Sequence, residues 1–224
     1  VNRTWGLTPP SIPVATATSG TLRAGKYQYA VTYLRNDGQE SGTGRAGTIE
    51  LTAQGGIALS GLPVSADATV AYKVVYLAPV GGETLYAAGV VANADTEFVV
   101  SETRTGASPL ATQFLAPPPA GEHIAYHGGY MLVATGSRLY PSQAYAPELF
   151  DARRSIPFTG AITMVAPVDD GVWVGTESQV IWLSGGVPEK WDFVVKADYG
   201  VIPYTETEAD GELLLDGSKT GQKV

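Results

Sequence analysis

The sequence predicts an all-β protein, a β-sandwich followed by part of a β-propeller, and three observations support this. Short apolar runs separated by glycine, proline, asparagine and aspartate recur along all 224 residues. Several runs alternate apolar with polar residues, and no segment keeps the apolar period of a helix for more than two turns. A glycine followed by apolar residues recurs at Gly129, Gly171 and Gly211, with intervals of 42 and 40 residues. A four-stranded propeller blade has about this length.

Residues 11–115 are expected to form a sandwich of about seven short strands. Tyrosine or valine occupies every second position from Tyr27 to Tyr33, which gives a strand over 26–33 one apolar face. The turn residues Asn36-Asp37-Gly38 follow and favour a hairpin. Further apolar runs predict strands at 48–51, 57–59, 70–77, 85–91 and 97–100.

Residues 116–121 are expected to be a stiff linker, because Pro117–Pro119 fix the backbone in an extended path. Blade strands are expected beyond it, within 122–224. The first blade is predicted from 123–126, 131–134 and 138–140, followed by a loop that contains Pro147 and Asp151. The second is predicted from 161–165, 172–175 and 180–183.

About two and a half blades fit into 122–224, whereas a closed ring typically has four to eight. A single blade cannot bury its faces alone, so it must stack on others. The missing blades lie outside this chain, or another chain supplies them, or residues 1–10 end a preceding blade into which the sandwich is inserted. The abrupt ends of the chain suggest an excised portion of a longer polypeptide.

Composition narrows the classes of function. The net charge of −8 argues against a large basic surface for nucleic acid or anionic lipid. The chain has no cysteine, which excludes disulfides, thiolate metal sites and thiol catalysis. No apolar run reaches 18 residues and the N-terminus has no apolar signal core, so neither membrane insertion nor a signal peptide is expected.

Two histidines and two glycine motifs could carry chemistry. His123 and His127 have helical zinc-site spacing, but Ile124 stands where HExxH needs glutamate, so we interpret them as packing or surface residues of a strand. Gly42–Gly47 matches a dinucleotide fingerprint, yet a strand-like run follows where a helix is needed, which favours an interstrand loop. Gly217–Thr220 lacks the spacing of a phosphate loop.

Acidic and aromatic residues leave a second hypothesis open. A glycoside hydrolase needs two carboxylates in an aromatic-lined cleft, and the candidates are Asp151, Asp169, Asp170, Glu206, Glu208 and Asp210, with Trp173, Trp182 and Trp191. Aspartates before Gly171 and Gly211 are, however, typical of hairpin turns. Trp173 and Trp182 suit a core between blades better than a ligand platform. No catalytic, cofactor-binding or metal-ligating residue is expected, and a calcium site among the acids stays an open alternative.

Two resemblances add to this. Gly25–Tyr33 together with Tyr72–Tyr76 resembles fibronectin type III domains, which implies two antiparallel sheets packed face to face. The order of Asn36–Gly42, Leu139–Ser142, Pro147–Asp151 and Gly171–Thr176 is similar to the tail nozzle and packaged-DNA stabilisation proteins of short-tailed bacteriophages. That resemblance implies propellers with an added sandwich, arranged as rings around the DNA exit channel, and no catalytic residues.

The first hypothesis is therefore a non-enzymatic virion protein, made in the host cytoplasm, that forms a tail nozzle, connector or hub. Its expected partners are copies of itself in a ring, other tail, portal or adaptor proteins, and DNA in non-specific passage. The loops at 36–38 and 81–82 would meet neighbouring subunits or project outward. The alternatives are a carbohydrate-binding or glycoside-cleaving propeller with an accessory sandwich, and a secreted adhesin module.

Overall fold

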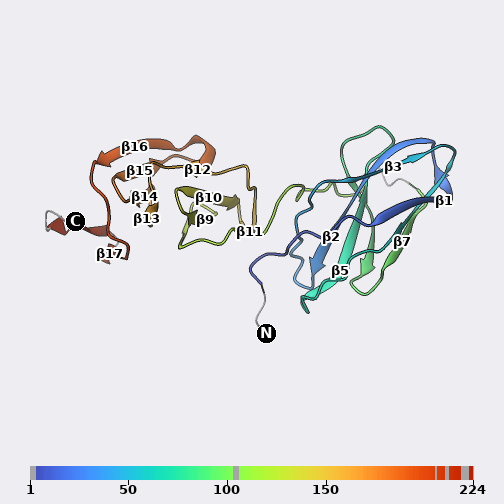
Figure 1. The fold of residues 1–224 in the computed structure, drawn as a ribbon, viewed down its shortest axis with the longest axis horizontal. Coiled ribbons are helices and arrows are strands. Elements are labelled where there is room, and N and C mark those ends of the chain that lie inside the picture. The colour runs from blue at the N-terminus through green and yellow to red at the C-terminus, as the bar shows by residue number, and fades with distance from the viewer. Residues whose placement is uncertain (1–3, 103–105, 205, 210–211, 218–221, 224) are drawn as a thin grey trace. The chain divides into compact units, whose positions relative to one another are not determined.

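The computed structural model describes residues 4–102, 106–204, 206–209, 212–217 and 222–223, with side chains up to residue 204. The chain divides into two compact units, Val1–Pro117 and Pro118–Val224, which are described separately (Figure 1). Strands dominate both units, and a single turn of 3-10 helix, η1 (Pro188–Lys190), is the one helical element of the described residues. This confirms the predicted all-β class.

Unit 1 contains two antiparallel sheets. In the three-stranded sheet the order is β1-β4-β7, and in the four-stranded sheet it is β3-β2-β5-β6. The bounds are β1 Val14–Leu22, β2 Gly25–Arg35, β3 Gly47–Leu51, β4 Gly55–Ser60, β5 Val70–Leu77, β6 Tyr86–Ala92 and β7 Glu97–Val100. Every strand predicted in this region is present within two residues of its expected ends, except that β2 is longer.

One apolar core joins the two sheets of unit 1. It includes Tyr27, Tyr29 and Val31 from β2 together with Ile57 and Leu59 from β4. The alternation that was read from the sequence therefore places the tyrosines of β2 between the sheets, in a sandwich-like arrangement. The turn at 36–38 also has the expected geometry, because Gly38 has a φ of 86° and the Arg35 N–H donates to the Gln39 carbonyl at 2.9 Å.

Two features of unit 1 differ from expectation. Strand β1 was not among the named strands, since Val14–Leu22 is rich in alanine and threonine and lies mostly exposed at a sheet edge. The segment 1–10, expected as the end of a preceding blade, belongs in its described part to unit 1. Leu7 is buried with Tyr33 and Val70, and the backbone carbonyl of Thr4 accepts a hydrogen bond from Arg35 Nη2 at 2.9 Å.

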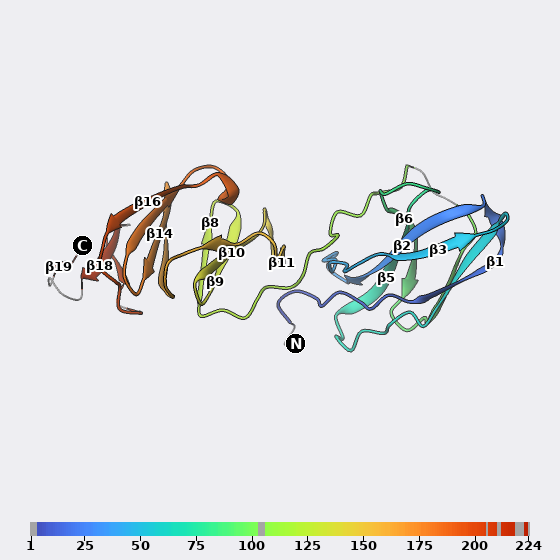
Figure 2. The same cartoon turned by 45° about the horizontal axis from the view of Figure 1, so that its top comes forward.

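Unit 2 consists of three antiparallel meanders that follow one another in chain order (Figure 2). The first runs β11-β10-β9-β8, with β12 also paired to β10; the second runs β13-β14-β15-β16; the third runs β17-β18-β19. The bounds are β8 His123–His127, β9 Tyr130–Thr135, β10 Arg138–Gln143, β11 Ala146–Phe150, β12 Ile156–Pro157, β13 Ile162–Val168, β14 Gly171–Thr176, β15 Val180–Ser184, β16 Asp192–Ala197, β17 Glu206–Ala209, β18 Glu212–Gly217 and β19 Gln222–Lys223.

The three meanders repeat with a constant interval of 41 residues. The pairs that close their first hairpins are His127–Tyr130, Val168–Gly171 and Ala209–Glu212. From 127 to 168 and from 168 to 209 the interval is 41 in both cases. The glycine echo in the sequence gave 42 and 40 because Gly129 and Gly211 lie before the strand, whereas Gly171 is its first residue.

Successive meanders stack through their first strands and share their cores. β8 lies against β13, and β13 in turn lies against β18. Leu132 and Ala134 of the first sheet pack with Val172 and Val174 of the second. The opposite face of the second sheet holds another cluster, which includes Met164 and which is apolar as well. The second sheet is therefore buried on both faces.

Two strands of unit 2 differ from the sequence-based expectation. The segment expected as a loop after the first blade forms β11 (Ala146–Phe150), an edge strand paired only to β10. Pro147 is compatible with that position because an edge strand can spare a backbone donor. Strand β16 was not predicted, although Phe193–Val195 carries the β-branched and aromatic residues of a strand.

Candidate functional site: an exposed sheet face and a cleft

The first sheet of unit 2 exposes an apolar face that the repeat would bury. The 41-residue interval makes Ile124, Tyr126 and Met131 equivalent to Val165, Pro167 and Val172. In the second sheet this face packs on the first sheet, and Val165 is only 8% exposed while Val172 is fully buried. In the first sheet Ile124 is 56% exposed and Tyr126 is 54% exposed. We call Ile124, Tyr126 and Met131 the open face.

Part of this face is covered by the chain that enters the sheet. Val133 lies on the same side as Ile124, its cross-strand partner, but is fully buried. Gly121 packs against it so closely that a Cβ there would lie 2.4 Å from Val133 Cγ1. The open face is therefore the part of the sheet that remains after this cover, nearer the hairpin at 128–129.

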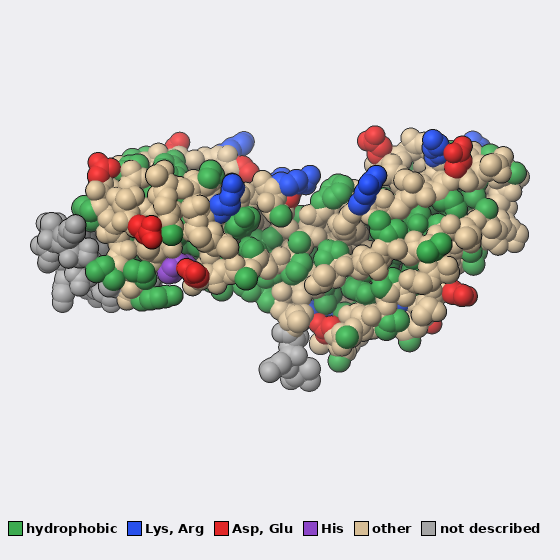
Figure 3. Space-filling model, viewed as in Figure 1, with side chains coloured by type: hydrophobic (Ala, Val, Ile, Leu, Met, Phe, Trp, Pro, Cys, Tyr) green, Lys and Arg blue, Asp and Glu red, His purple; other side chains and the backbone are tan. Residues whose placement is uncertain are grey.

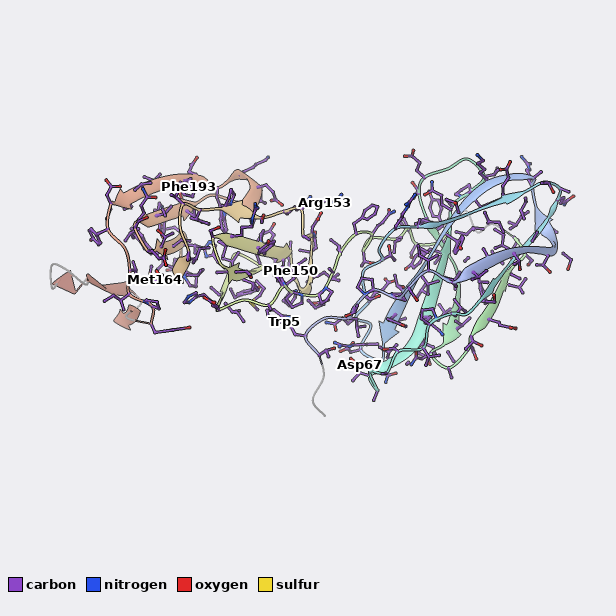
Figure 4. The ribbon with its side chains drawn as sticks, viewed as in Figure 1. Trp5, Asp67, Phe150, Arg153, Met164 and Phe193 are labelled. Carbon is purple, nitrogen blue, oxygen red and sulfur yellow. The ribbon has the colours of Figure 1, made fainter. Side chains whose placement is uncertain are left out.

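A cleft of about 500 Å³ lies between the first and second sheets of unit 2. The first sheet contributes residues from β10, β12 and the segment before β12, and the second contributes residues from β15, η1 and β16. The lining residues are Pro141, Arg153, Arg154, Ser155, Ile156, Pro157, Leu183, Pro188, Glu189, Trp191 and Phe193. Figure 4 shows Arg153 and Phe193, which lie toward the same side of the unit, whereas Met164 lies on the other.

Ion pairs fix both arginines of the cleft. Arg153 Nε and Nη2 donate to the two oxygens of Asp151 at 2.9 and 2.8 Å, and the Arg153 backbone N–H adds a third bond at 3.0 Å. These bonds hold the pKa of the Asp151 carboxyl below its ordinary value, although burial opposes them. Arg154 Nη1 donates to Glu189 Oε1 at 2.8 Å and so links the first sheet to the second.

The two aromatic side chains of the cleft are also held in place. Trp191 Nε1 donates to the Gly185 carbonyl at 3.1 Å, and its ring meets His127 edge-on at 6.0 Å. Phe193 packs on Phe158 at 5.3 Å between ring centroids. The ring of Phe193 is nevertheless 47% exposed. The cleft therefore combines oriented guanidinium groups with aromatic surface that water still reaches.

The histidines lie on strand β8, as expected, and each contacts an aromatic ring. His123 is buried and lies 5.4 Å from the ring of Tyr204, while His127 contacts Trp191. Both are packing residues of the sheet. Among the residues that the structure describes, no three histidine, cysteine or acidic side chains come together as metal ligands would.

The glycine motif at 42–47 lies in a loop between strands, where it serves packing. A Cβ on Gly42 would lie 1.7 Å from the carbonyl oxygen of Leu115. The loop is tied to this same segment, since the Phe114 N–H donates to the Thr43 carbonyl at 2.8 Å. The motif precedes strand β3 and no helix, so its glycines do not meet a pyrophosphate site. The other motif, 217–220, lies largely outside the described residues.

The acidic candidates do not form one site. Asp151 is paired to Arg153, whereas Asp169 and Asp170 occupy the exposed turn between β13 and β14. Glu206 and Glu208 are on β17, whose side chains lie outside the described residues, as does Asp210. The depressed pKa of Asp151 suits a carboxylate that orients an arginine and does not suit a general acid.

The tryptophans fall into two groups. Trp173 and Trp182 are cross-strand partners with ring centroids 4.8 Å apart, and Trp173 packs on the cluster that contains Met164. Trp191 alone lines the cleft. Sequence reasoning missed the arginines beside it, although Arg153-Arg154 is the one pair of adjacent basic residues in the chain. It also missed Ile124 and Tyr126, because exposure of an apolar face cannot be read from alternation.

Two comparisons with known proteins and one scan against family models were negative: no family model matches, and no curated protein or solved structure is significantly similar. Within the described part of the chain, no helix has the length and apolar character required to span a bilayer.

Proposed function

We propose that this chain is a non-catalytic structural protein of a bacteriophage tail, a nozzle, connector or hub that assembles around the DNA channel. The single observation that carries the proposal is the open face. A repeat of 41 residues stacks three sheets, and the first of them exposes at Ile124 and Tyr126 the surface that its successor buries. Repeat proteins of this kind gain stability only from neighbouring repeats.

The meanders are interpreted as blades of a propeller that is completed by other sheets. Adjacent blades meet through their first strands, and β8, β13 and β18 contact one another in this order. A further sheet on the open face would continue that series. In an assembly of identical subunits, such a contact joins different surfaces of two copies and closes into a ring when the rotation permits.

The charge of the chain suits a wall past which DNA moves. A net charge of −8 repels phosphates, so DNA would pass without adhering. The resemblance to tail nozzle and packaged-DNA stabilisation proteins, which rests on short motifs such as Asn36–Gly42 and Gly171–Thr176, points to the same role. Copies of this chain and other tail, portal or adaptor proteins are the proposed partners.

The test is the oligomeric state of the purified chain, by mass photometry and negative-stain electron microscopy. We expect particles of fixed copy number with a central channel. Tyr126→Glu should shift them toward monomers, because it places a charge where a sheet would dock. Tyr72→Glu is the matched control, since Tyr72 is an exposed tyrosine (47%) on β5 in unit 1 and should leave assembly unchanged.

Two outcomes would count against the proposal. The first is a chain that stays monomeric at every concentration examined, with Tyr126→Glu indistinguishable from the parent. The second is tight binding of duplex DNA at physiological salt, because a channel wall must let DNA slide. Rings that bind no DNA, and that Tyr126→Glu dissociates, would support it.

A further inference from the structure

From the cleft between the first and second sheets of unit 2, we infer a binding site for an acidic saccharide, a sugar that carries a carboxylate. The cleft holds about 500 Å³, which is within the range of small-ligand sites. It opens between the sheets, whereas Ile124 and Tyr126 lie on the other face of the first sheet. The inference goes beyond the proposed assembly and does not depend on it.

Charge is the first argument. The chain as a whole carries −8, but the side chains that line the cleft carry two positive charges, on Arg153 and Arg154, and one negative charge, on Glu189. Figure 3 shows basic side chains on the upper side of unit 2 in this view. A local excess of positive charge in an acidic protein favours an anionic ligand.

Preorganisation is the second argument. Asp151, nearly buried itself, grips Arg153 through two side-chain bonds, while the guanidinium remains 70% exposed at the rim. A planar guanidinium in a fixed orientation binds a carboxylate with little further loss of side-chain entropy. The Asp151 partner also raises the pKa of Arg153, so the charge is permanent.

The mixture of groups selects a sugar. Trp191 and Phe193 present aromatic surface, on which the apolar C–H face of a pyranose ring can pack. Glu189 accepts hydrogen bonds and Ser155 both donates and accepts, so they suit the hydroxyl groups of a sugar. A purely acidic peptide would gain from the arginines but would be repelled by Glu189. A neutral sugar would leave Arg153 without an anionic partner among the ligand's groups.

The cleft is expected to bind without cleaving. Glycoside hydrolysis needs one carboxyl group that is protonated at working pH. Asp151 is ion-paired with a depressed pKa, and Glu189 is held by Arg154 at 2.8 Å. Both carboxylates are therefore committed to orienting arginines.

The test is calorimetric titration of the full chain with sialyllactose and with trigalacturonate, against lactose and maltotriose as neutral comparators. We expect the acidic sugars to bind at least about tenfold more tightly than the neutral ones, as a charge-assisted pair contributes. Arg154→Gln and Phe193→Ser, which alter half-exposed side chains that the fold tolerates, should each weaken binding by about tenfold. Arg45→Gln, an exposed arginine in unit 1, is the control and should have no effect.

Arg153→Lys sharpens the result, because it keeps the charge but loses the planar fork; we expect it to weaken acidic sugars and leave any neutral sugar unaffected. Equal affinity for acidic and neutral sugars, no binding at millimolar ligand, or binding that Arg154→Gln and Phe193→Ser leave intact would overturn the inference. A hexaglutamate peptide that binds in place of the sugars would also overturn it and would indicate a site for an acidic protein segment.

Discussion

Arg35 Nη2 lies 3.0 Å from Asp67 Oδ2, and both side chains are largely withdrawn from water, with Arg35 1% and Asp67 16% exposed. The same Nη2 donates to the carbonyl and to the hydroxyl oxygen of Thr4, both at 2.9 Å. Asp67 also accepts from the Thr69 hydroxyl at 2.6 Å and from its backbone N–H at 2.9 Å. This network ties the start of the described chain to the end of β2.

Removal of the carboxylate should strongly destabilise unit 1. Asp67→Ala leaves the buried Arg35 charge without its anionic partner, and we expect the free energy of unfolding to fall by about 3 kcal/mol or more. Urea unfolding followed by far-UV circular dichroism measures this. Glu83→Gln, at an exposed site, should change stability by less than about 0.5 kcal/mol. Equal effects of the two substitutions would contradict the role of the pair.

Unit 1 should lose stability in acid through the same residue. Hydrogen bonds from Thr69, and then from Arg35 and Thr4, hold the pKa of the Asp67 carboxyl well below its ordinary value of 3.8, against the opposing effect of burial. The folded state therefore binds this proton less readily than the unfolded chain. The contribution is fully present above pH 3.8 and is lost as the pH falls below that value toward the folded pKa.

Unfolding curves between neutral pH and about pH 2 test this acid sensitivity. The parent should lose more stability across the window than Asp67→Asn, which cannot titrate at this site. Other carboxylates titrate in both proteins, so the difference between the two curves isolates Asp67. Parallel curves would show that Asp67 does not contribute.

Sequence periodicity predicted most of the strands because alternation survives wherever one face of a strand is buried. It succeeded for β5 (Val70–Leu77), whose ends match the prediction. It missed β1 and β16, which are mostly exposed and so carry little alternation. The cleft could not be predicted, since Arg153 and Trp191 lie on different sheets and meet only through the stacking of meanders.

Gly42 should be irreplaceable for a packing reason. A Cβ at this position would lie 1.7 Å from the Leu115 carbonyl oxygen, and backbone atoms cannot move aside cheaply. We therefore expect Gly42→Ala to cost about 3 kcal/mol or to prevent folding of unit 1. Gly44→Ala, where nothing lies within 4 Å of the added Cβ, should be nearly neutral. Thermal unfolding of the two variants compares two glycines of one motif.

The repeat itself predicts opposite outcomes for one substitution at equivalent positions. Ile124 pairs with Val133 and Val165 with Val174, each 41 residues apart, but Ile124 is 56% exposed and Val165 is 8% exposed. Val165→Asp should bury a charge between two sheets and lower the free energy of unfolding of unit 2 by about 3 kcal/mol or more. Ile124→Asp should change the stability of the monomer by less than about 0.5 kcal/mol.

Assembly should respond in the opposite way. Ile124→Asp leaves each chain folded but places a charge on the open face, so we expect the oligomer to dissociate at concentrations where the parent remains assembled. Chemical unfolding of dilute protein reads the first effect, and mass photometry across a concentration series reads the second. If Ile124→Asp destabilised the monomer as much as Val165→Asp, Ile124 would already be buried by this chain, and no further sheet would be needed on the open face.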